Sequence, residues 1–150
     1  MPNIVKGRDF LGSMRYTPHN FPIKVKERRS MPIVDIEIVN PTEVIRDVLT
    51  HSIANDLGKT LGSSEGGTWV RVHTIEKNHY AENSPTPIDG WPIFVSILHR
   101  KLPSQATLAL EIKEITDLLS KAFRRPKELI HVIYQPSASG RIAFGGTVVW

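Results

Sequence analysis

The chain has 150 residues, 40% of them hydrophobic, with no cysteine and a formal net charge of +4. This length suffices for one domain with its own core, and the lack of cysteine excludes disulfides, thiolate nucleophiles and cysteine-based metal sites. No apolar run is long enough to span a bilayer, and residues 1–30 lack the apolar segment of a secretory signal. We therefore expect a cytoplasmic protein that does not bind membranes.

The positive charge belongs to residues 1–31, which carry seven basic side chains against two acidic ones. Residues 32–150 carry twelve basic and thirteen acidic side chains, and a body this close to neutral argues against a nucleic-acid-binding face. The first segment contains prolines and little periodicity. We interpret it as a basic N-terminal extension, either a leader or an arm; a disordered tail is the simpler alternative.

The first expected strand begins where the sequence resembles the start of a protein, at Met31 followed by Pro32. In PIVDIEIV, apolar and acidic residues alternate, as is typical of a strand with one buried face. A helix is expected next, N-capped by Thr42 and ended by Gly58. Its inward stripe consists of Val44, Ile45, Val48, Leu49, Ile53 and Leu57. A second strand, WVRVHTI, starts at Trp69.

The second half repeats this pattern at an offset of 60 residues. PIFVSILHR, from Pro92, matches the first strand, and LIHVIYQ, from Leu129, matches the second. Between them, Ser104 caps an expected helix that stops before Pro126. Its inward residues are Leu108, Ile112, Ile115, Leu119 and Phe123.

Each half is therefore strand–helix–strand, which requires a parallel strand pair with a crossover helix on one face. Two such units predict an α+β fold: a four-stranded mixed sheet with two helices on one face and a short C-terminal hairpin. We divide the domain, 32–150, into a first β-α-β unit (32–75), a linker (76–91), a second unit (92–135) and the hairpin (136–150). The other face of the sheet carries charges and a tryptophan, so it is either open to water or covered by another subunit.

These features resemble the tautomerase superfamily. A proline at the head of the first strand, the doubled unit, VRV in the second strand and the closing GRIAFGG segment carry the resemblance over residues 32–149. Members include 4-oxalocrotonate tautomerase (4-OT), macrophage migration inhibitory factor and cis-3-chloroacrylic acid dehalogenase. The resemblance implies a homotrimer with its sheets around a central barrel and its helices outside. It also implies a small acidic organic substrate and no cofactor.

In that family the amino-terminal proline is the catalytic group, which implies the same role for Pro32. An internal proline nitrogen is an amide without a basic lone pair. A terminal one is a secondary amine with a reference pKa of about 7.7–8.0, which an apolar pocket lowers further. Such a base suits proton transfer near neutral pH. The role requires Met31 to be the true start or a processing site; otherwise Pro32 is an ordinary strand-opening proline, as Pro92 is.

Two arginines match positions that hold substrate carboxylates in the family, a task that suits the planar guanidinium. Arg71, in the second strand, corresponds to an arginine of 4-OT, and the alternative is an ion pair with Asp35 or Glu37 on the same face. Arg100 follows the third strand, where the dehalogenase has its first carboxylate-binding arginine. The alternative for Arg100 is a solvated loop charge.

Three further residues receive roles from the resemblance. Tyr134 matches a tyrosine near the substrate of the dehalogenase, so it would donate a proton or a hydrogen bond to an enolate; a structural tyrosine at the sheet edge is the alternative. Ile142 and Phe144 resemble the apolar lid beside the proline, which would desolvate it. The histidines lack the spacing of metal ligands, so we expect no metal site.

The sequence also departs from the dehalogenase, whose helix histidine, second arginine and C-terminal glutamate are replaced by Leu57, Pro103 and Ala143. Without a carboxylate to activate water, hydrolytic dehalogenation is only an alternative. We favour a tautomerase or isomerase that moves a proton (keto-enol or double-bond shift) on a 2-hydroxy-dienoate or 2-oxo acid. If residues 1–31 stay attached, the alternative is a non-catalytic trimeric binding module.

Overall fold

The computed structural model describes residues 31–41, 47–84 and 90–150. The expected extension up to residue 30, the expected N-cap Thr42, and Val44 and Ile45 of the first helical stripe lie outside these ranges. The strands are β1 (Ile33–Val39), β2 (Trp69–Ile75), β3 (Ile93–Leu98), β4 (Ile130–Tyr134), β5 (Ala143–Phe144) and β6 (Thr147–Val148). The helices are α1 (Asp47–Thr60) and α2 (Gln105–Phe123), with short 3-10 helices η1 (Lys77–His79) and η2 (Lys127–Leu129).

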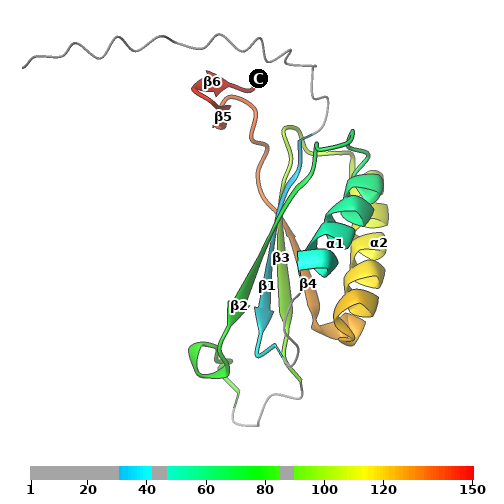
Figure 1. Ribbon diagram of the computed structural model, residues 1–150, viewed down its shortest axis with the longest axis vertical. Coiled ribbons are helices and arrows are strands. Elements are labelled where there is room, and N and C mark those ends of the chain that lie inside the picture. The colour runs from blue at the N-terminus through cyan, green and yellow to red at the C-terminus, as the bar shows by residue number, and fades with distance from the viewer. Residues whose placement is uncertain (1–30, 42–46, 85–89) are drawn as a thin grey trace, which may run out of the picture.

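Four of the strands form one mixed sheet in the order β2-β1-β3-β4. The two strands of each unit are parallel, β1 with β2 and β3 with β4, whereas the central pair β1 and β3 is antiparallel. Both helices lie on the same face of this sheet (Figure 1). The predicted fold class is confirmed, including the short antiparallel hairpin of β5 and β6.

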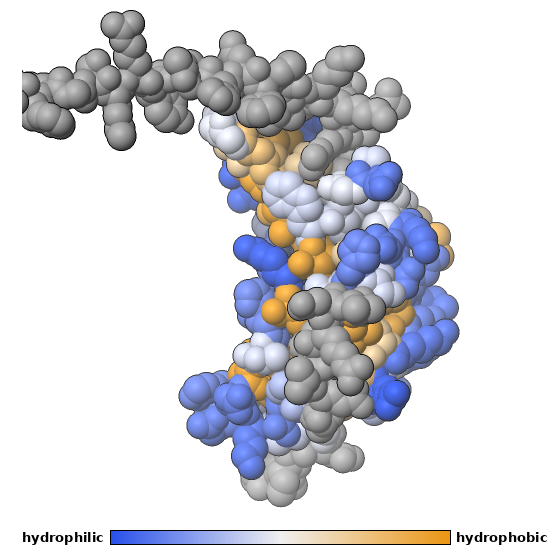
Figure 2. All heavy atoms as spheres, in the orientation of Figure 1, coloured by the Kyte–Doolittle hydropathy of each residue, from blue (hydrophilic) through white to orange (hydrophobic). Residues whose placement is uncertain are grey.

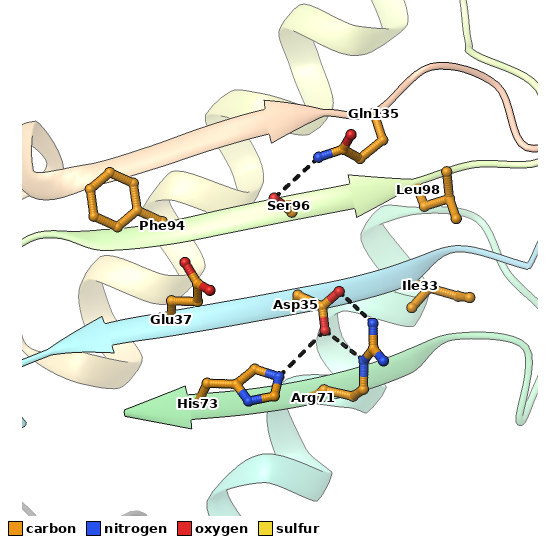
Figure 3. A pocket seen from close by; sticks show the side chains of 9 residues that line it. All are labelled: Ile33, Asp35, Glu37, Arg71, His73, Phe94, Ser96, Leu98 and Gln135. Atoms are coloured by element: carbon orange, nitrogen blue, oxygen red, sulfur yellow. Dashed lines mark hydrogen bonds and ion pairs between the residues drawn. The ribbon is translucent and has the colours of Figure 1, made fainter. Parts of the chain in front are cut away.

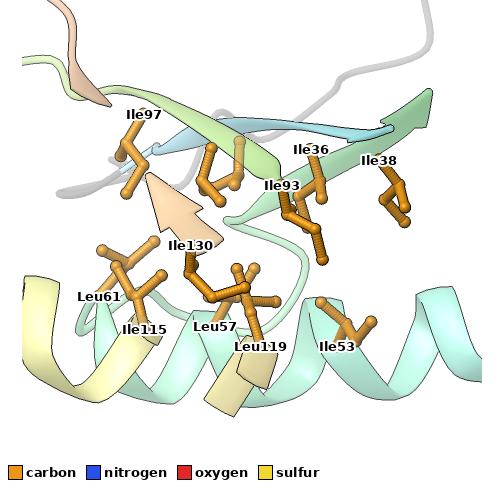
Figure 4. Close-up of a cluster of buried hydrophobic side chains, with 12 residues drawn as sticks. Ile36, Ile38, Ile53, Leu57, Leu61, Ile93, Ile97, Ile115, Leu119 and Ile130 are labelled. Carbon is orange, nitrogen blue, oxygen red and sulfur yellow. The ribbon is translucent and has the colours of Figure 1, made fainter. Parts of the chain in front are cut away.

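The core lies between the sheet and the two helices because one face of each strand is apolar (Figure 4). Along the central strands every second side chain points to the helices and is buried. The buried core residues are Val34, Ile36, Ile38, Ile53, Leu57, Leu61, Ile93, Val95, Ile97, Ile115, Leu119 and Ile130. On the outer surface of the helices, hydrophilic side chains gather (Figure 2).

Helix α1 continues past Gly58, where the sequence predicted its end, to Thr60. The glycine that follows the helix in the left-handed conformation is Gly62, with φ of 61°. Gly58 is instead a packing position: a Cβ there would lie 3.3 Å from the hydroxyl of Ser63, which hydrogen-bonds to Thr68. The prediction of the helix end at Gly58 was wrong because this glycine serves a close approach rather than a turn.

Helix α2 begins as predicted, with the hydroxyl of Ser104 accepting a hydrogen bond from the backbone N–H of Thr107 at 3.2 Å. The expected inward stripe is wrong at one position, because Ile112 is 38% exposed. Glu111 takes the buried place instead and is only 8% exposed. The helix thus turns a carboxylate, rather than an isoleucine, toward the carboxyl end of β4, where the hydroxyl of Tyr134 donates a hydrogen bond to it.

After β4 the chain continues past the end of the sheet at which β1 begins, and the hairpin of β5 and β6 lies beyond that end (Figure 1). The guanidinium of Arg141 donates to the backbone carbonyls of Pro136 and Ser137 and fixes the approach to the hairpin. The two strands are joined by Gly145 and Gly146, both with positive φ, as a tight turn requires. The hairpin is therefore held near the start of β1.

Candidate active site

Pro32 lies at the head of β1 with its side chain fully buried on the face that packs against the helices. Its carbonyl accepts a hydrogen bond from the backbone N–H of Trp69 at 3.1 Å, which ties it to the start of β2. In the sheet register, Ile33 stands opposite Leu98, so the next pair outward is Pro32 and His99. The predicted base therefore sits between the start of β2 and the end of β3.

The hairpin supplies an aromatic contact at this end of the sheet. The ring of Phe144 meets the ring of Trp69 edge to face, with centroids 4.8 Å apart and an interplanar angle of 77°. Ile142 is half-buried like Phe144, and its carbonyl accepts a hydrogen bond from the N–H of Val149. The ring of Phe144 therefore lies on the open face, which Trp69 shares with Arg71, and Trp69 is joined to Pro32 through its backbone.

Arg100 belongs to the same end of the molecule. Its carbonyl accepts a hydrogen bond from the N–H of Ser139, and the carbonyl of His99 accepts one from Ala138. This loop therefore runs beside the segment that leads into the hairpin. The Nε atom of Arg100 is buried and has no hydrogen-bond partner among the described residues. A role for Arg100 in binding a carboxylate stays a prediction.

Arg71 lies on the other, open face of the sheet (Figure 3). Its Nε and Nη2 atoms donate to the two carboxylate oxygens of Asp35, each at 2.6 Å. The two residues stand directly opposite each other on β1 and β2, whereas Glu37 stands opposite His73. The hydrogen bond to Asp35, followed by the charge of that carboxylate, raises the pKa of Arg71. The guanidinium is thus paired with Asp35 within the chain, on the face away from the Pro32 side chain.

The open face is hollowed into a pocket of about 410 Å³ around this ion pair (Figure 3). His73 adds a weaker contact, with its Nε2 3.7 Å from Oδ1 of Asp35. The pocket is lined by Ile33, Asp35, Glu37, Arg71, His73, Phe94, Ser96, Leu98 and Gln135. It has both polar and apolar walls, so it can face water or a second polypeptide.

Tyr134, the last residue of β4, points toward α2 and is half-buried. Its hydroxyl donates a hydrogen bond to Oε2 of Glu111 at 2.6 Å. Burial, and then this hydrogen bond and the charge of the carboxylate, raise the pKa of Tyr134 far above its usual value. The phenol is therefore a neutral hydrogen-bond donor, and its contact with a substrate stays a prediction.

Two functional candidates, His99 and Glu111, were not predicted from the sequence. The imidazole of His99 stacks on the ring of Tyr134, with centroids 5.7 Å apart and an angle of 4°. Its Nε2 lies 3.6 Å from Oε2 of Glu111. Burial lowers the pKa of His99, and the charge of Glu111 opposes this only in part. Two signals were available: His99 continues the buried alternation of β3, and Glu111 lies one helical turn before Ile115.

Among the described residues, no three histidine or acidic side chains gather in an arrangement that could hold a metal ion. Within the same ranges, no helix has both the length and the apolar composition needed to cross a membrane.

No protein-family model and no curated protein sequence matches this chain. Solved structures do match. Macrophage migration inhibitory factor from Oncomelania hupensis is 12% identical with a TM-score of 0.65, over 80% of this chain and 83% of that one. A fused wild-type 4-OT, described as a symmetric trimer, is 8% identical with a TM-score of 0.65, over 78% and 94%.

A third similar structure is that of Pt0534 inactivated by 2-oxo-3-pentynoate, at 11% identity and a TM-score of 0.64 over 78% of this chain and 94% of that one. At such low identities the likeness concerns the backbone, and it extends over nearly the whole of the matched chains. The doubled β-α-β unit, the strand order and the closing hairpin agree with it. This chain has the fold of the tautomerase superfamily.

Proposed function

We propose that this protein is a tautomerase or isomerase that moves a proton on a small 2-hydroxy-dienoate or 2-oxo acid, with Pro32 as its amino-terminal general base. The observation that carries the proposal is the position of Pro32, at the head of the first strand of this fold, with its side chain buried and its carbonyl hydrogen-bonded to the N–H of Trp69. When the chain begins at Pro32, its nitrogen is a secondary amine. Apolar surroundings disfavour the charged form of that amine and so keep it available as a base.

The substrate class follows from charge and from a similar protein. Pt0534 is inactivated by 2-oxo-3-pentynoate, and it shares this fold. Arg100 is the predicted anchor for the substrate carboxylate, because its loop lies next to the segment that leads into the hairpin. Arg71 would contribute only if a substrate or a neighbouring subunit displaced Asp35 from it. Tyr134 would stabilise the enolate only if its single hydroxyl proton turned from Glu111 to the substrate.

The test compares two chain lengths. A chain expressed from Met31 should lose its initiator methionine, begin at Pro32 and ketonise phenylenolpyruvate. The 150-residue chain should be inactive, because in it the nitrogen of Pro32 is a tertiary amide whose electrons are delocalised into the carbonyl. Pro32→Ala in the shorter chain should reduce the rate strongly. Equal rates from both chain lengths would exclude Pro32 as the base.

The shorter chain retains all that the fold needs. Every strand and helix of the described residues, and every core side chain among them, lies within residues 32–150. The three similar structures match 78–80% of this chain and 83–94% of their own lengths. We therefore expect the shorter chain to fold, and a melting curve matched to that of the full chain checks this.

A second candidate rests on the peptide bond between Met31 and Pro32. If that bond persists in the cell, Pro32 cannot act as a base, and the fold would serve as a trimeric binding module. Mass spectrometry of the protein from its natural source separates the candidates. An N-terminus at Pro32 supports the enzyme, and a retained Met1 supports the module.

A further inference from the structure

The register of the central strands pairs His99 with Pro32, although the two residues are far apart in the sequence. The N–H of Val39 donates to the carbonyl of Pro92, so these two residues form a hydrogen-bonded pair of the antiparallel ladder. Counting along the strands, Pro32 and His99 form a non-hydrogen-bonded pair. In such pairs the side chains on one face approach most closely. Both side chains are buried, and the strand alternation puts both on the helix face, so the register makes them cross-strand neighbours.

Next to His99 lies a carboxylate that the fold has buried. Glu111 and His99 are only 8% and 6% exposed. Oε2 of Glu111 accepts the hydrogen bond of Tyr134, so this carboxylate has a donor although it is buried. The Nε2 atom of His99 has no hydrogen-bond partner among the described residues, and the ring is stacked on Tyr134. The imidazole that the register pairs with Pro32 thus has its Nε2 3.6 Å from a buried carboxylate.

We propose that Glu111 is a positioning residue for the base: its buried charge favours the protonated form of the freed Pro32 nitrogen and offsets the opposite effect of the apolar surroundings. The inference rests on the proposed function, because only a freed Pro32 carries this nitrogen. The carboxylate acts through space, past His99, and touches no substrate. Tyr134 holds it in place. In a poorly hydrated interior such an interaction is screened far less than at the surface.

Of the other described charges around the cluster, Arg100 is the one that competes with Glu111. Arg100, next to His99 in the chain, is a cation and would oppose the effect of Glu111 on Pro32. Arg141 donates to backbone carbonyls. The remaining titratable side chains of the packed elements are exposed or paired with each other: His51, Asp56 with Lys59, Asp117 with Lys113 and Lys127, Glu114, Lys121, and His131 on the open face.

The test measures the pKa of Pro32 directly, by NMR titration of the ¹⁵N-labelled proline nitrogen in the chain that begins at Pro32. Glu111→Gln should lower this pKa by about one unit, because the ammonium loses a nearby negative charge. The rise of kcat/KM with pH should move to lower pH by the same amount. Glu114→Gln is the matched control, since it removes an equal charge from the exposed side of α2 and should shift neither quantity.

If Glu111→Gln does not fold, the double variant Glu111→Met with Tyr134→Phe replaces it, because that change removes the carboxylate and its donor together and leaves neither of them unpaired. The same lowering is expected. An unchanged pKa, or an equal shift in Glu114→Gln, would overturn the inference. The titration needs no turnover, so a shift in an inactive protein would contradict the proposed function and leave the inference standing.

Discussion

The two arginines predicted to bind substrate have different surroundings. Arg71 is held by both oxygens of Asp35, whereas the Nε of Arg100 is buried without a partner among the described residues. An arginine already paired with a carboxylate has less to gain from a second one. Arg100 is therefore the better candidate to bind a substrate carboxylate.

We expect Arg100→Ala to raise KM or lower kcat for an acidic substrate, so that kcat/KM falls about ten- to a hundredfold, the size of one charge-assisted contact. Steady-state kinetics on the chain that begins at Pro32 measure this. Arg71→Ala is the comparison and should chiefly weaken assembly, because it leaves Asp35 without its partner. Unchanged kcat/KM in both variants would eliminate the carboxylate clamp.

At the scale of single residues, the sequence predicted on which face of the sheet a side chain lies better than it predicted which residue that side chain contacts. It placed Arg71 on the open face but left open whether Asp35 or Glu37 would be its ion-pair partner, since both lie on that face. Only the register, which pairs Asp35 with Arg71, decides between them. Glu111 was overlooked for a related reason: a glutamate inside an apolar helical stripe looks like a surface residue until Tyr134 is found opposite it.

At the scale of elements, the hairpin connects the C-terminus to the site. Its Phe144 reaches Trp69, and Trp69 is hydrogen-bonded to Pro32. The hairpin was predictable from the GRIAFGG segment, but the strand that it contacts was not. The contact of Phe144 with Trp69 joins residues far apart in the chain, so the pattern of neighbouring residues in the sequence cannot predict it.

We expect Phe144→Ala to raise the pKa of Pro32 toward the reference value of a terminal amine, about 7.7–8.0, because water would then reach the charged form more easily. The rise of kcat/KM with pH should accordingly move to higher pH. A pH–rate profile measures this. Val148→Ala is the control, since Val148 lies on β6 of the same hairpin and is 42% exposed. Identical profiles for wild type and Phe144→Ala would contradict a desolvating lid.

At the scale of the whole molecule, the fold followed from the sequence because the repeat is long and periodic. Two strand–helix–strand units allow few arrangements, and the observed sheet is the expected one. The repeat by itself does not show whether the strands of the two units run parallel or antiparallel to each other, because it describes each unit separately. The antiparallel pairing of β1 and β3 decides that direction.

We predict a homotrimer, because the open face carries a pocket with polar and apolar walls that a second polypeptide can cover. Light scattering at micromolar concentration should give three times the mass of the chain. A stable monomer under these conditions would contradict the prediction and remove any role for a neighbouring subunit at the site.

The antiparallel pairing of β1 and β3 also places the two strand-opening prolines, Pro32 and Pro92, at opposite ends of the sheet. Pro92 heads the second unit as Pro32 heads the first, yet it lies beside Val39, at the opposite end of the sheet. There Arg125 donates to the carbonyls of Trp91 and Asn40, in place of a hairpin. Because a polypeptide has a single amino terminus, each chain can present one reactive proline, and only at one end of its sheet. An amine-directed reagent should therefore modify at most one proline per chain, half of what two separate single-unit chains could offer.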